Sequence, residues 1–283
     1  MELNADNVTN VRWETADGRE VEGRFWPHDE AAASVVLIHG TGDHIGRFEW
    51  LARQLNRSGY QVIGADWQGN GQSPGTRGYV ESFELVCDEI DRMIGAARER
   101  SSSPLFLYGQ SLGGLLALYR MMQGKKPAVA GVIASSPALG LAIDPPAWKL
   151  LVGRTLGKLF PKMNLPTGIQ VDELTRDEAA QEAFRNDRLR HGRICARTFF
   201  SMLDLATWVN TNPERLNTPT LVMHGESDTV TDCEASKRFS ESAFDECQFK
   251  PWPELRHELH QEIGKLEVVE YVIRWIESQL TAN

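Results

Sequence analysis

The chain has 283 residues, of which 41% are hydrophobic, and its formal net charge is −9. This composition suffices for a large core, and the acidic balance argues against nucleic acid as a partner, because phosphate binding needs a basic surface. The four cysteines are scattered without metal-ligand spacing, so we expect free thiols in a reducing compartment.

The amino-terminal residues are polar and acidic, without the basic and apolar regions of a signal peptide. No apolar run approaches the roughly 18 residues that a membrane span needs. We therefore expect a soluble protein of the cytoplasm.

Strands and helices alternate through the first half of the chain. Two strands are expected around a turn at Asp17–Gly18, within residues 9–26. Continuous apolar runs predict buried strands at 34–38, 60–66, 104–108 and 129–134. Amphipathic spacing predicts helices at 47–57, 80–98 and 112–122. This alternation predicts an α/β fold, with a mostly parallel sheet and helices on both of its faces.

The alternation stops at residues 139–210, where the patterns are helical and no convincing strand occurs. We expect a helical insertion there, between a first core part at 1–138 and a second at 211–283. The core resumes with strands at 220–224 and 246–250 and helices at 232–243 and 265–280.

One helix of the insertion has an apolar stripe between residues 147 and 160. The stripe consists of Trp148, Leu151, Val152, Leu156, Leu159 and Phe160. Lys149, Arg154, Lys158 and Lys162 lie among or beside these residues. Two alternatives stay open: the stripe packs on the core, or part of it lines the mouth of a substrate tunnel while the basic flank contacts an anionic membrane surface.

A candidate nucleophile lies directly after the strand 104–108. Gly109, Ser111 and Gly113 form a G-x-S-x-G pattern that opens the helix from Leu112. In such a tight strand-to-helix turn the flanking residues must be small, and the turn lifts the serine hydroxyl above the sheet edge. The alternative is a glycine-rich turn with an exposed serine.

Two backbone amides are candidates for an oxyanion hole. Attack by Ser111 creates an oxyanion that needs two N–H donors. The amide of Leu112 follows the nucleophile, and Thr41 lies between Gly40 and Gly42 in the loop after the strand 34–38. The neighbouring His39 is interpreted as a packed core residue.

A serine nucleophile needs a base, and the base needs a carboxylate that orients it. In this architecture they follow in the order Ser, Asp or Glu, His. Asp228 lies in the loop after the strand 220–224 and is the preferred acid, with Glu226 and Asp232 as competitors. Asp232 is better explained as a residue at a helix N-terminus.

Two histidines follow Asp228 in the chain. His257 lies on a loop that can reach back over Ser111 and is the preferred base, and His260 is its alternative. We interpret His260 as a solvated or capping residue. The sequence thus predicts the catalytic set Ser111, Asp228 and His257.

With these residues identified, the chain resembles the monoacylglycerol lipase and lysophospholipase branch of the α/β-hydrolase superfamily. The matching strings are His39–His44 with Arg47, Asp66–Ser73 with Gly75 and Arg77-Gly78, Gly109–Gly114, Gly225–Asp228, and His257-Glu258 with Glu262. The resemblance implies a lipid-like ester of one fatty acyl chain as substrate, a cap at 139–210 over an acyl tunnel, and an oxyanion hole of Thr41 and Leu112.

The chain departs from the branch at Asp43, where Glu is more frequent, and at Asn70, where His is. Both positions support the site, so they weaken any statement about the head group. The mechanism implies no metal or organic cofactor. The alternatives are a short-chain carboxylesterase or thioesterase with the same triad, and a catalytically silent binding protein.

Overall fold

The computed structural model describes residues 8–15, 18–143 and 145–282. Asp17 of the expected turn lies outside these residues. Eight strands form one sheet in the order β1-β2-β4-β3-β5-β6-β9-β10. Its strands are β1 (Thr9–Glu14), β2 (Glu20–Trp26), β3 (Ala33–Ile38), β4 (Tyr60–Asp66), β5 (Leu105–Gln110), β6 (Gly131–Ser135), β9 (Thr220–Gly225) and β10 (Cys247–Trp252).

The strands β4, β3, β5, β6, β9 and β10 are parallel to one another. At one edge of the sheet, β1 pairs antiparallel with β2, and β2 pairs antiparallel with β4. The central strands β3, β4, β5, β6 and β9 are buried along their whole length. This burial on both faces explains the continuous apolar runs in the sequence. The mostly parallel sheet that the alternation predicts is confirmed.

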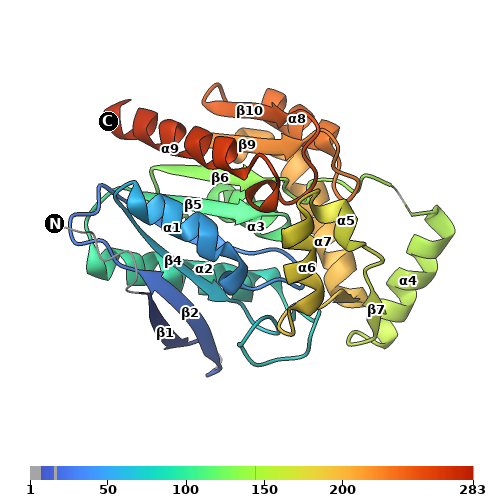
Figure 1. Ribbon diagram of the computed structural model, residues 1–283. Coiled ribbons are helices and arrows are strands. Elements are labelled where there is room, and N and C mark those ends of the chain that lie inside the picture. Colours follow the sequence, from blue (N-terminus) through green and yellow to red (C-terminus); the bar gives the residue numbers. More distant parts are fainter. Residues whose placement is uncertain (1–7, 16–17, 144, 283) are drawn as a thin grey trace.

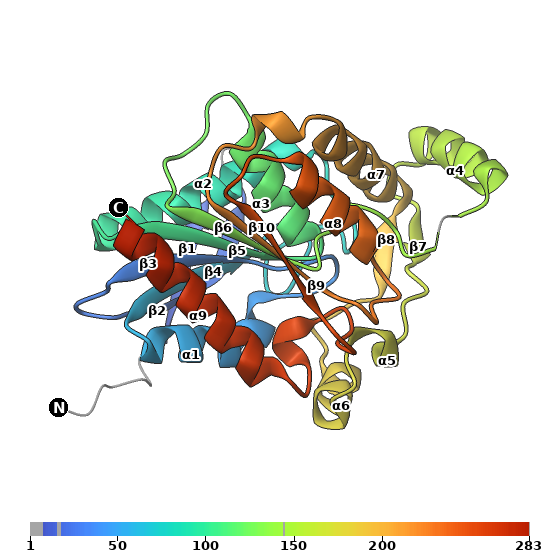
Figure 2. The ribbon, with the colours of Figure 1, turned by 90° about the horizontal axis from the view of Figure 1, so that it is seen from above.

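Helices cover both faces of the sheet (Figures 1 and 2). The helices of the core are α1 (Glu49–Arg57), α2 (Phe83–Arg100), α3 (Leu112–Met122), α8 (Cys233–Ser242) and α9 (Lys265–Ala282), with short 3₁₀ helices η1 (Ile45–Phe48), η2 (Pro213–Arg215) and η3 (Leu259–Gln261). Helices α1 and α9 share one apolar cluster with the sheet. Helices α2, α3 and α8 share the cluster on the other face.

The segment 139–210 contains two strands that the sequence did not indicate. Its elements are α4 (Ala147–Leu159), β7 (Asn164–Pro166), α5 (Val171–Leu174), α6 (Glu178–Asn186), β8 (Arg193–Cys195) and α7 (Ala196–Thr211). Strands β7 and β8 pair antiparallel. The expectation of an insertion without strands was therefore wrong, because strands of three residues are too short to leave an alternating pattern.

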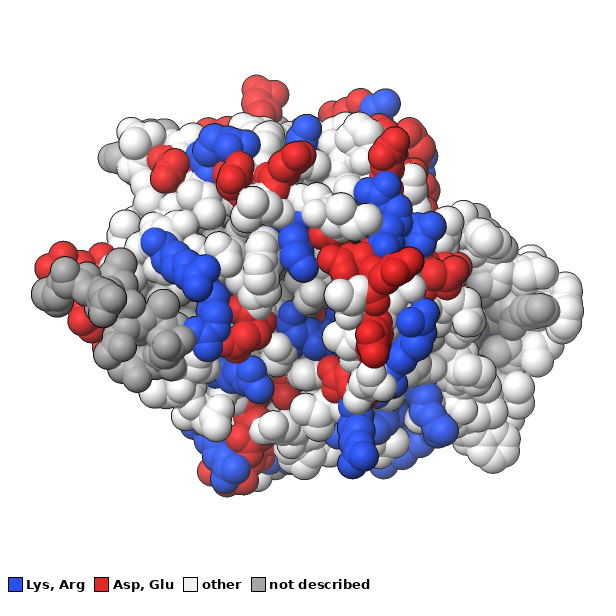
Figure 3. All heavy atoms as spheres, viewed as in Figure 1, with Lys and Arg blue, Asp and Glu red and all other residues white. Residues whose placement is uncertain are grey.

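Helix α4 presents its apolar stripe outward. Trp148, Leu151 and Leu159 are 64%, 71% and 67% exposed, so packing of the stripe on the core is excluded. The helix contacts α7 through Gly153, which lies against Phe200, and through Gly157, which lies against Ala196. Both views place α4 at the periphery (Figures 1 and 2), and charged atoms are sparse over it in Figure 3.

Within the described ranges, no helix combines the length and the hydropathy that crossing a bilayer requires. Cys87, Cys195, Cys233 and Cys247 all carry free thiols, as their spacing predicts.

Candidate active site

Ser111 occupies a strained turn between β5 and α3. Its φ of 55° and ψ of −119° lie outside the regions that side chains normally favour. Glycine is required on both sides, because a Cβ at Gly109 would collide with the carbonyl of Gly113, and one at Gly113 with the carbonyl of Ile38. The Ser111 amide donates to the carbonyl of Ser135 at 2.9 Å. The turn holds Ser111 at the carboxyl end of the sheet and the N-terminus of α3.

The loop after β3 lies directly against Ser111. A Cβ at Gly40 would be 3.1 Å from the Cβ of Ser111, and Thr41 lines the same cavity as Ser111. Leu112 is the first residue of α3, where backbone N–H groups have no partner within the helix. The structure thus brings Thr41 and Leu112 to Ser111. His39 is fully buried and stacks on Trp67, as expected of a core residue.

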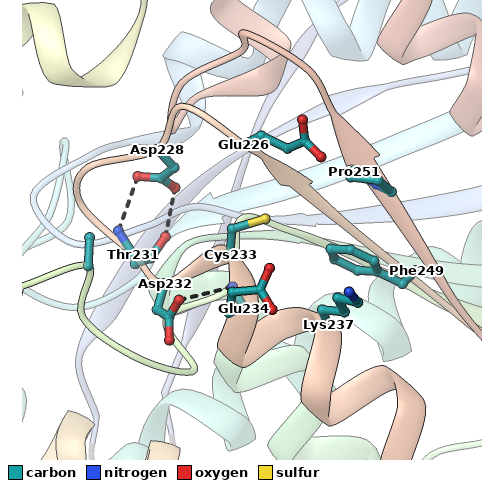
Figure 4. A pocket seen from close by; sticks show the side chains of 10 residues that line it. Glu226, Asp228, Thr231, Asp232, Cys233, Glu234, Lys237, Phe249 and Pro251 are labelled. Atoms are coloured by element: carbon teal, nitrogen blue, oxygen red, sulfur yellow. Dashed lines mark hydrogen bonds between the residues drawn. The ribbon is translucent and has the colours of Figure 1, made fainter.

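Asp228 and His257 form a buried pair. His257 Nδ1 lies 2.7 Å from Asp228 Oδ2, and their side chains are 4% and 0% exposed. The second oxygen of Asp228 accepts from the amides of Val230 at 2.7 Å and Thr231 at 3.1 Å. Figure 4 shows the carboxylate bonded to Thr231, with Glu226 apart from both.

The competitors for these roles lie elsewhere. Glu226 is exposed, and Asp232 caps α8 by accepting from the amide of Glu234 at 2.9 Å. His260 is buried and stacks on Phe48 at 4.4 Å between ring centroids, so the expectation of a solvated residue was wrong. His257 lines the cavity at Ser111 and His260 does not.

Charges and burial set opposite pKa shifts in the pair. Burial disfavours the charged form of Asp228, but the charge of His257 and the hydrogen bonds from His224 and His257 outweigh it and hold the pKa of Asp228 far below its usual range. Burial also lowers the pKa of His257, but the charge and the hydrogen bond of Asp228 leave it raised above 6.5. Burial lowers the pKa of His260 to about 3.

Ser111 and His257 open onto a cavity of about 660 Å³. Most of its apolar lining comes from the segment 139–210, with Leu150, Leu165, Ile169, Ile194, Phe199, Phe200 and Met202. Leu150 and Gly153 are the residues that α4 contributes, and none of its stripe residues is among them. The idea that the stripe lines the tunnel mouth was therefore wrong.

The wall near His257 is polar. Arg47 bonds Asp43 at 2.9 Å and Glu258 at 2.6 Å, and all three side chains are less than a tenth exposed. Burial and the neighbouring Asp43 raise the pKa of Glu258, although the charge of Arg47 opposes them. The guanidinium of Arg190 lies over Phe184, 4.4 Å from the ring centroid, and lines the same wall.

Backbone and side-chain bonds fasten the segment 139–210 to the loop beside Ser111. The amide of His191 donates to the carbonyl of Gly42 at 3.0 Å, and His44 Nε2 lies 2.7 Å from Asp187 Oδ2. Gly42 adopts a φ of +69°, and a Cβ there would collide with the carbonyl of His191. The loop that carries Thr41 is thus held in place by the segment 139–210.

Sequence reasoning missed His224 and Thr231, which both contact Asp228. His224 Nε2 lies 3.0 Å from Asp228 Oδ2, and Thr231 Oγ1 donates to the same oxygen at 2.8 Å. A signal was present, since both residues lie within four positions of Asp228 at the end of β9. Their place on a buried strand end and a loop instead suggested core and turn residues.

Three comparisons bear on this geometry. A family model described as serine aminopeptidase S33 matches residues 29–264. Phospholipase YtpA of Bacillus subtilis is 33% identical over 245 residues, which cover 86% of this chain and 94% of that protein. The crystal structure of a monoacylglycerol lipase of Paleococcus ferrophilus matches with a TM-score of 0.81 at 29% identity, covering 96% of this chain and 99% of that one.

A further relative is much longer. An abhydrolase domain-containing protein of Dictyostelium discoideum is 32% identical over 94% of this chain, which spans 28% of that protein's length.

Proposed function

The chain belongs to the α/β-hydrolase family described as serine aminopeptidase S33 and is a serine hydrolase of carboxylic esters. From this premise we propose that it cleaves esters of one fatty acyl chain through an acyl-enzyme on Ser111. The observation that carries the proposal is the cavity, which Ser111 and His257 line together with many apolar side chains. The relatives named phospholipase and monoacylglycerol lipase support the same substrate class.

In the proposed mechanism Ser111 attacks the ester carbonyl while His257 Nε2 takes its proton. Asp228 holds the imidazole through Nδ1 and stabilises its charge. The amides of Thr41 and Leu112 receive the oxyanion. His257 then protonates the leaving alcohol, and water repeats the cycle on the acyl-enzyme.

We assign the residues 139–210 as a cap over the acyl chain, between core parts at 1–138 and 211–283. The apolar wall supports this assignment, since this segment provides Leu165, Ile194 and Phe200. The same wall favours a long acyl chain over the short acyl chains of a short-chain carboxylesterase, which would leave most of it uncovered.

The test is a substrate panel with Ser111→Ala beside the unaltered enzyme. We expect hydrolysis of long-chain monoacylglycerol or lysophospholipid above short esters, diacylglycerol and triacylglycerol. The variant should fold and lose several orders of magnitude in turnover, and a fluorophosphonate probe should label the unaltered enzyme alone. Activity of the variant above about a tenth, with contaminating esterase excluded, contradicts the mechanism.

We also propose that α4 contacts a lipid surface. Five of its stripe residues, with Ile143 before the helix, are at least half exposed: Ile143, Trp148, Leu151, Val152, Leu159 and Phe160. A peripheral apolar helix of this kind can lie in the boundary between headgroups and acyl chains. Arg154 is engaged by Asp204 at 2.8 Å, and the side chain of Lys149 lies outside the described part of the chain. Among the described side chains, Lys158 and Lys162 remain as the basic flank.

A further inference from the structure

The Asp228 carboxylate is shared between two histidines. His257 and His224 approach its Oδ2 oxygen from different elements, at 2.7 Å and 3.0 Å. His224 lies in β9 and is fully buried, whereas His257 lies in the loop after β10. The second histidine therefore contacts the acid at the same atom as the proposed base.

The surroundings of His224 determine where its ring carries a proton. Nε2 faces Asp228 Oδ2 and, at 3.3 Å, the carbonyl oxygen of Thr231. An ionised carboxylate and a carbonyl are acceptors only, so Nε2 must carry the hydrogen. Nδ1 lies 2.8 Å from Ser236 Oγ, a hydroxyl that can donate to it. This tautomer satisfies both ring nitrogens.

Ser236 is itself fully buried and belongs to α8. Its place is fixed because its amide donates to the carbonyl of Asp232 and its carbonyl accepts from Ser240 Oγ at 2.9 Å. The backbone of α8 therefore fixes the position of the Ser236 hydroxyl. A chain of hydrogen bonds runs from α8 through His224 and Asp228 to His257.

A second cavity, whose lining does not include Ser111, reaches the same loop. It measures about 450 Å³ and is lined by Glu226, Asp228, Thr231 and Asp232, among others (Figure 4). The Asp228 side chain is nevertheless 0% exposed. Donors from the protein thus occupy both carboxylate oxygens, and the orientation of the acid does not depend on water from this cavity.

We propose that His224, with its tautomer set by Ser236, is a positioning residue that fixes the Asp228 carboxylate for the imidazole of His257. The inference rests on the proposed function, because it assigns His224 a part in aligning that triad. His224 touches neither Ser111 nor the cavity, so it acts through Asp228. The hydrogen bond from His224 also draws negative charge away from Oδ2. This weakens the effect by which Asp228 raises the pKa of His257.

Two near-isosteric variants separate the two bonds of the His224 ring. In His224→Gln the amide nitrogen can take the place of Nε2, so the donor to Asp228 is kept and the contact with Ser236 is lost. In His224→Asn the side chain can keep the contact with Ser236, and the donor to Asp228 is lost. Both are measured on a soluble p-nitrophenyl ester, with melting temperature as the test of folding.

We expect His224→Asn to lower kcat by about tenfold, the loss typical of one hydrogen bond to a charged group, with KM little changed. The acid limb of its pH profile should move upward, because a less neutralised Asp228 raises the pKa of His257. The other charged groups that face His257 are Asp43 and Glu258, and both are intact in the variant. His224→Gln should recover most of kcat and the original limb.

Ser236→Ala gives an independent measurement with a minimal change in volume. It removes the donor that sets the tautomer of His224. We therefore expect kcat to fall, but by less than in His224→Asn. The inference is overturned if His224→Asn is folded and has the kcat and acid limb of the unaltered enzyme, or if His224→Gln and His224→Asn lose activity equally. An active Ser111→Ala would instead overturn the proposed function itself.

Discussion

At the scale of the residue, the Asp228 carboxylate shows how burial is made compatible with charge. Five donors surround it, namely the amides of Val230 and Thr231, the Thr231 hydroxyl and the rings of His224 and His257. An unpaired buried carboxylate would take up a proton and lose its function. The donors keep it ionised, which is the state that holds His257 with its proton on Nδ1.

Asp228→Asn should therefore cost about 10⁴ in turnover. The amide that replaces Oδ2 would present hydrogens to His257, and the imidazole would move its proton to Nε2, where a base needs a lone pair. Steady-state kinetics on a p-nitrophenyl ester measures the loss. Glu226→Gln and Asp232→Asn are the matched controls and should retain turnover. If turnover collapsed in either control while Asp228→Asn stayed nearly normal, that carboxylate and not Asp228 would be the acid of the triad.

The pH profile should report the raised pKa of His257. Only the neutral ring can accept the Ser111 proton, so kcat/KM should rise with pH through one apparent pKa above 6.5, the ordinary value for histidine. His257→Ala should be inactive. His260→Phe should keep both activity and the limb, because the ring at 260 serves to pack on Phe48. If the acid limb of the pH profile moved in His260→Phe, His260 would replace His257 as the base.

Residue types and spacing carried the prediction of Ser111, Asp228 and His257, because each follows a strand in a fixed order. The short spacing between His224 and Asp228 was too weak a signal, because their contact depends on how the loop turns back after Gly225. Nor could spacing place His260 in the core, since a histidine beside a helix start is equally compatible with solvent. Contacts within loops depend on tertiary geometry that no local pattern encodes.

At the scale of the element, α4 shows where periodicity misleads. An apolar stripe normally predicts the buried face of a helix. Here Gly153, which is half-buried, and Gly157, which is buried, face α7, because the absence of a side chain lets the two helices approach closely. The apolar residues then remain on the outer face. The apolar pattern predicted the helix and its limits. Which face of α4 turns towards the protein is determined by the two glycines, which a hydropathy pattern does not identify.

Replacing Leu151 and Leu159 with Ser should weaken binding to vesicles. Both side chains are more than two-thirds exposed, so folding should be unaffected, and each lost leucine removes roughly 1.5 kcal/mol or more of transfer free energy into lipid. Co-sedimentation with anionic and neutral vesicles, at low and high salt, measures the effect. Hydrolysis of long-chain monoacylglycerol should slow, while short soluble esters stay unaffected.

Leu266→Ser on α9 is the matched control, since Leu266 is 56% exposed and lies outside the segment 139–210. It should bind vesicles like the unaltered protein. Equal binding by the α4 double variant would contradict docking through α4. A preference for anionic vesicles that salt removes would assign the remaining attraction to Lys158 and Lys162.

At the scale of the whole molecule, a buried ionic network joins parts of the chain that are far apart in sequence. Arg47 follows β3, Glu258 follows β10, and the Arg47 guanidinium lies 3.4 Å from the ring centroid of Phe184 in α6. Gln261 adds a bond from its side chain to the Arg47 carbonyl at 2.6 Å. Arg47 therefore ties together the two core parts and the segment 139–210 beside the active site.

Arg47→Met should lower the free energy of unfolding by about 3–5 kcal/mol, the cost of leaving buried charges without a partner. The matched control is Arg154→Met, which breaks the ion pair between Arg154 and Asp204. Their side chains are 46% and 59% exposed, so this loss should not exceed about 1 kcal/mol. Urea unfolding at neutral pH compares the two, and equal losses would contradict a network that acts through burial.

The pH dependence of the Arg47→Met loss tests the same network by its sign. Without Arg47, the charges of Asp43 and Glu258 face each other in a buried site, and both groups hold protons more tightly than in the unfolded chain. Glu258, whose pKa is already raised in the intact protein, should take up a proton first as the pH falls. The variant's deficit should therefore be largest at neutral pH and shrink towards about pH 5, because protonation removes one of the two unpaired charges. Urea titrations of the variant and the unaltered protein at both pH values measure this difference. A deficit that is the same at both pH values would show that Arg47 stabilises the fold by packing on Phe184 and not by charge, because a packing contact binds no proton.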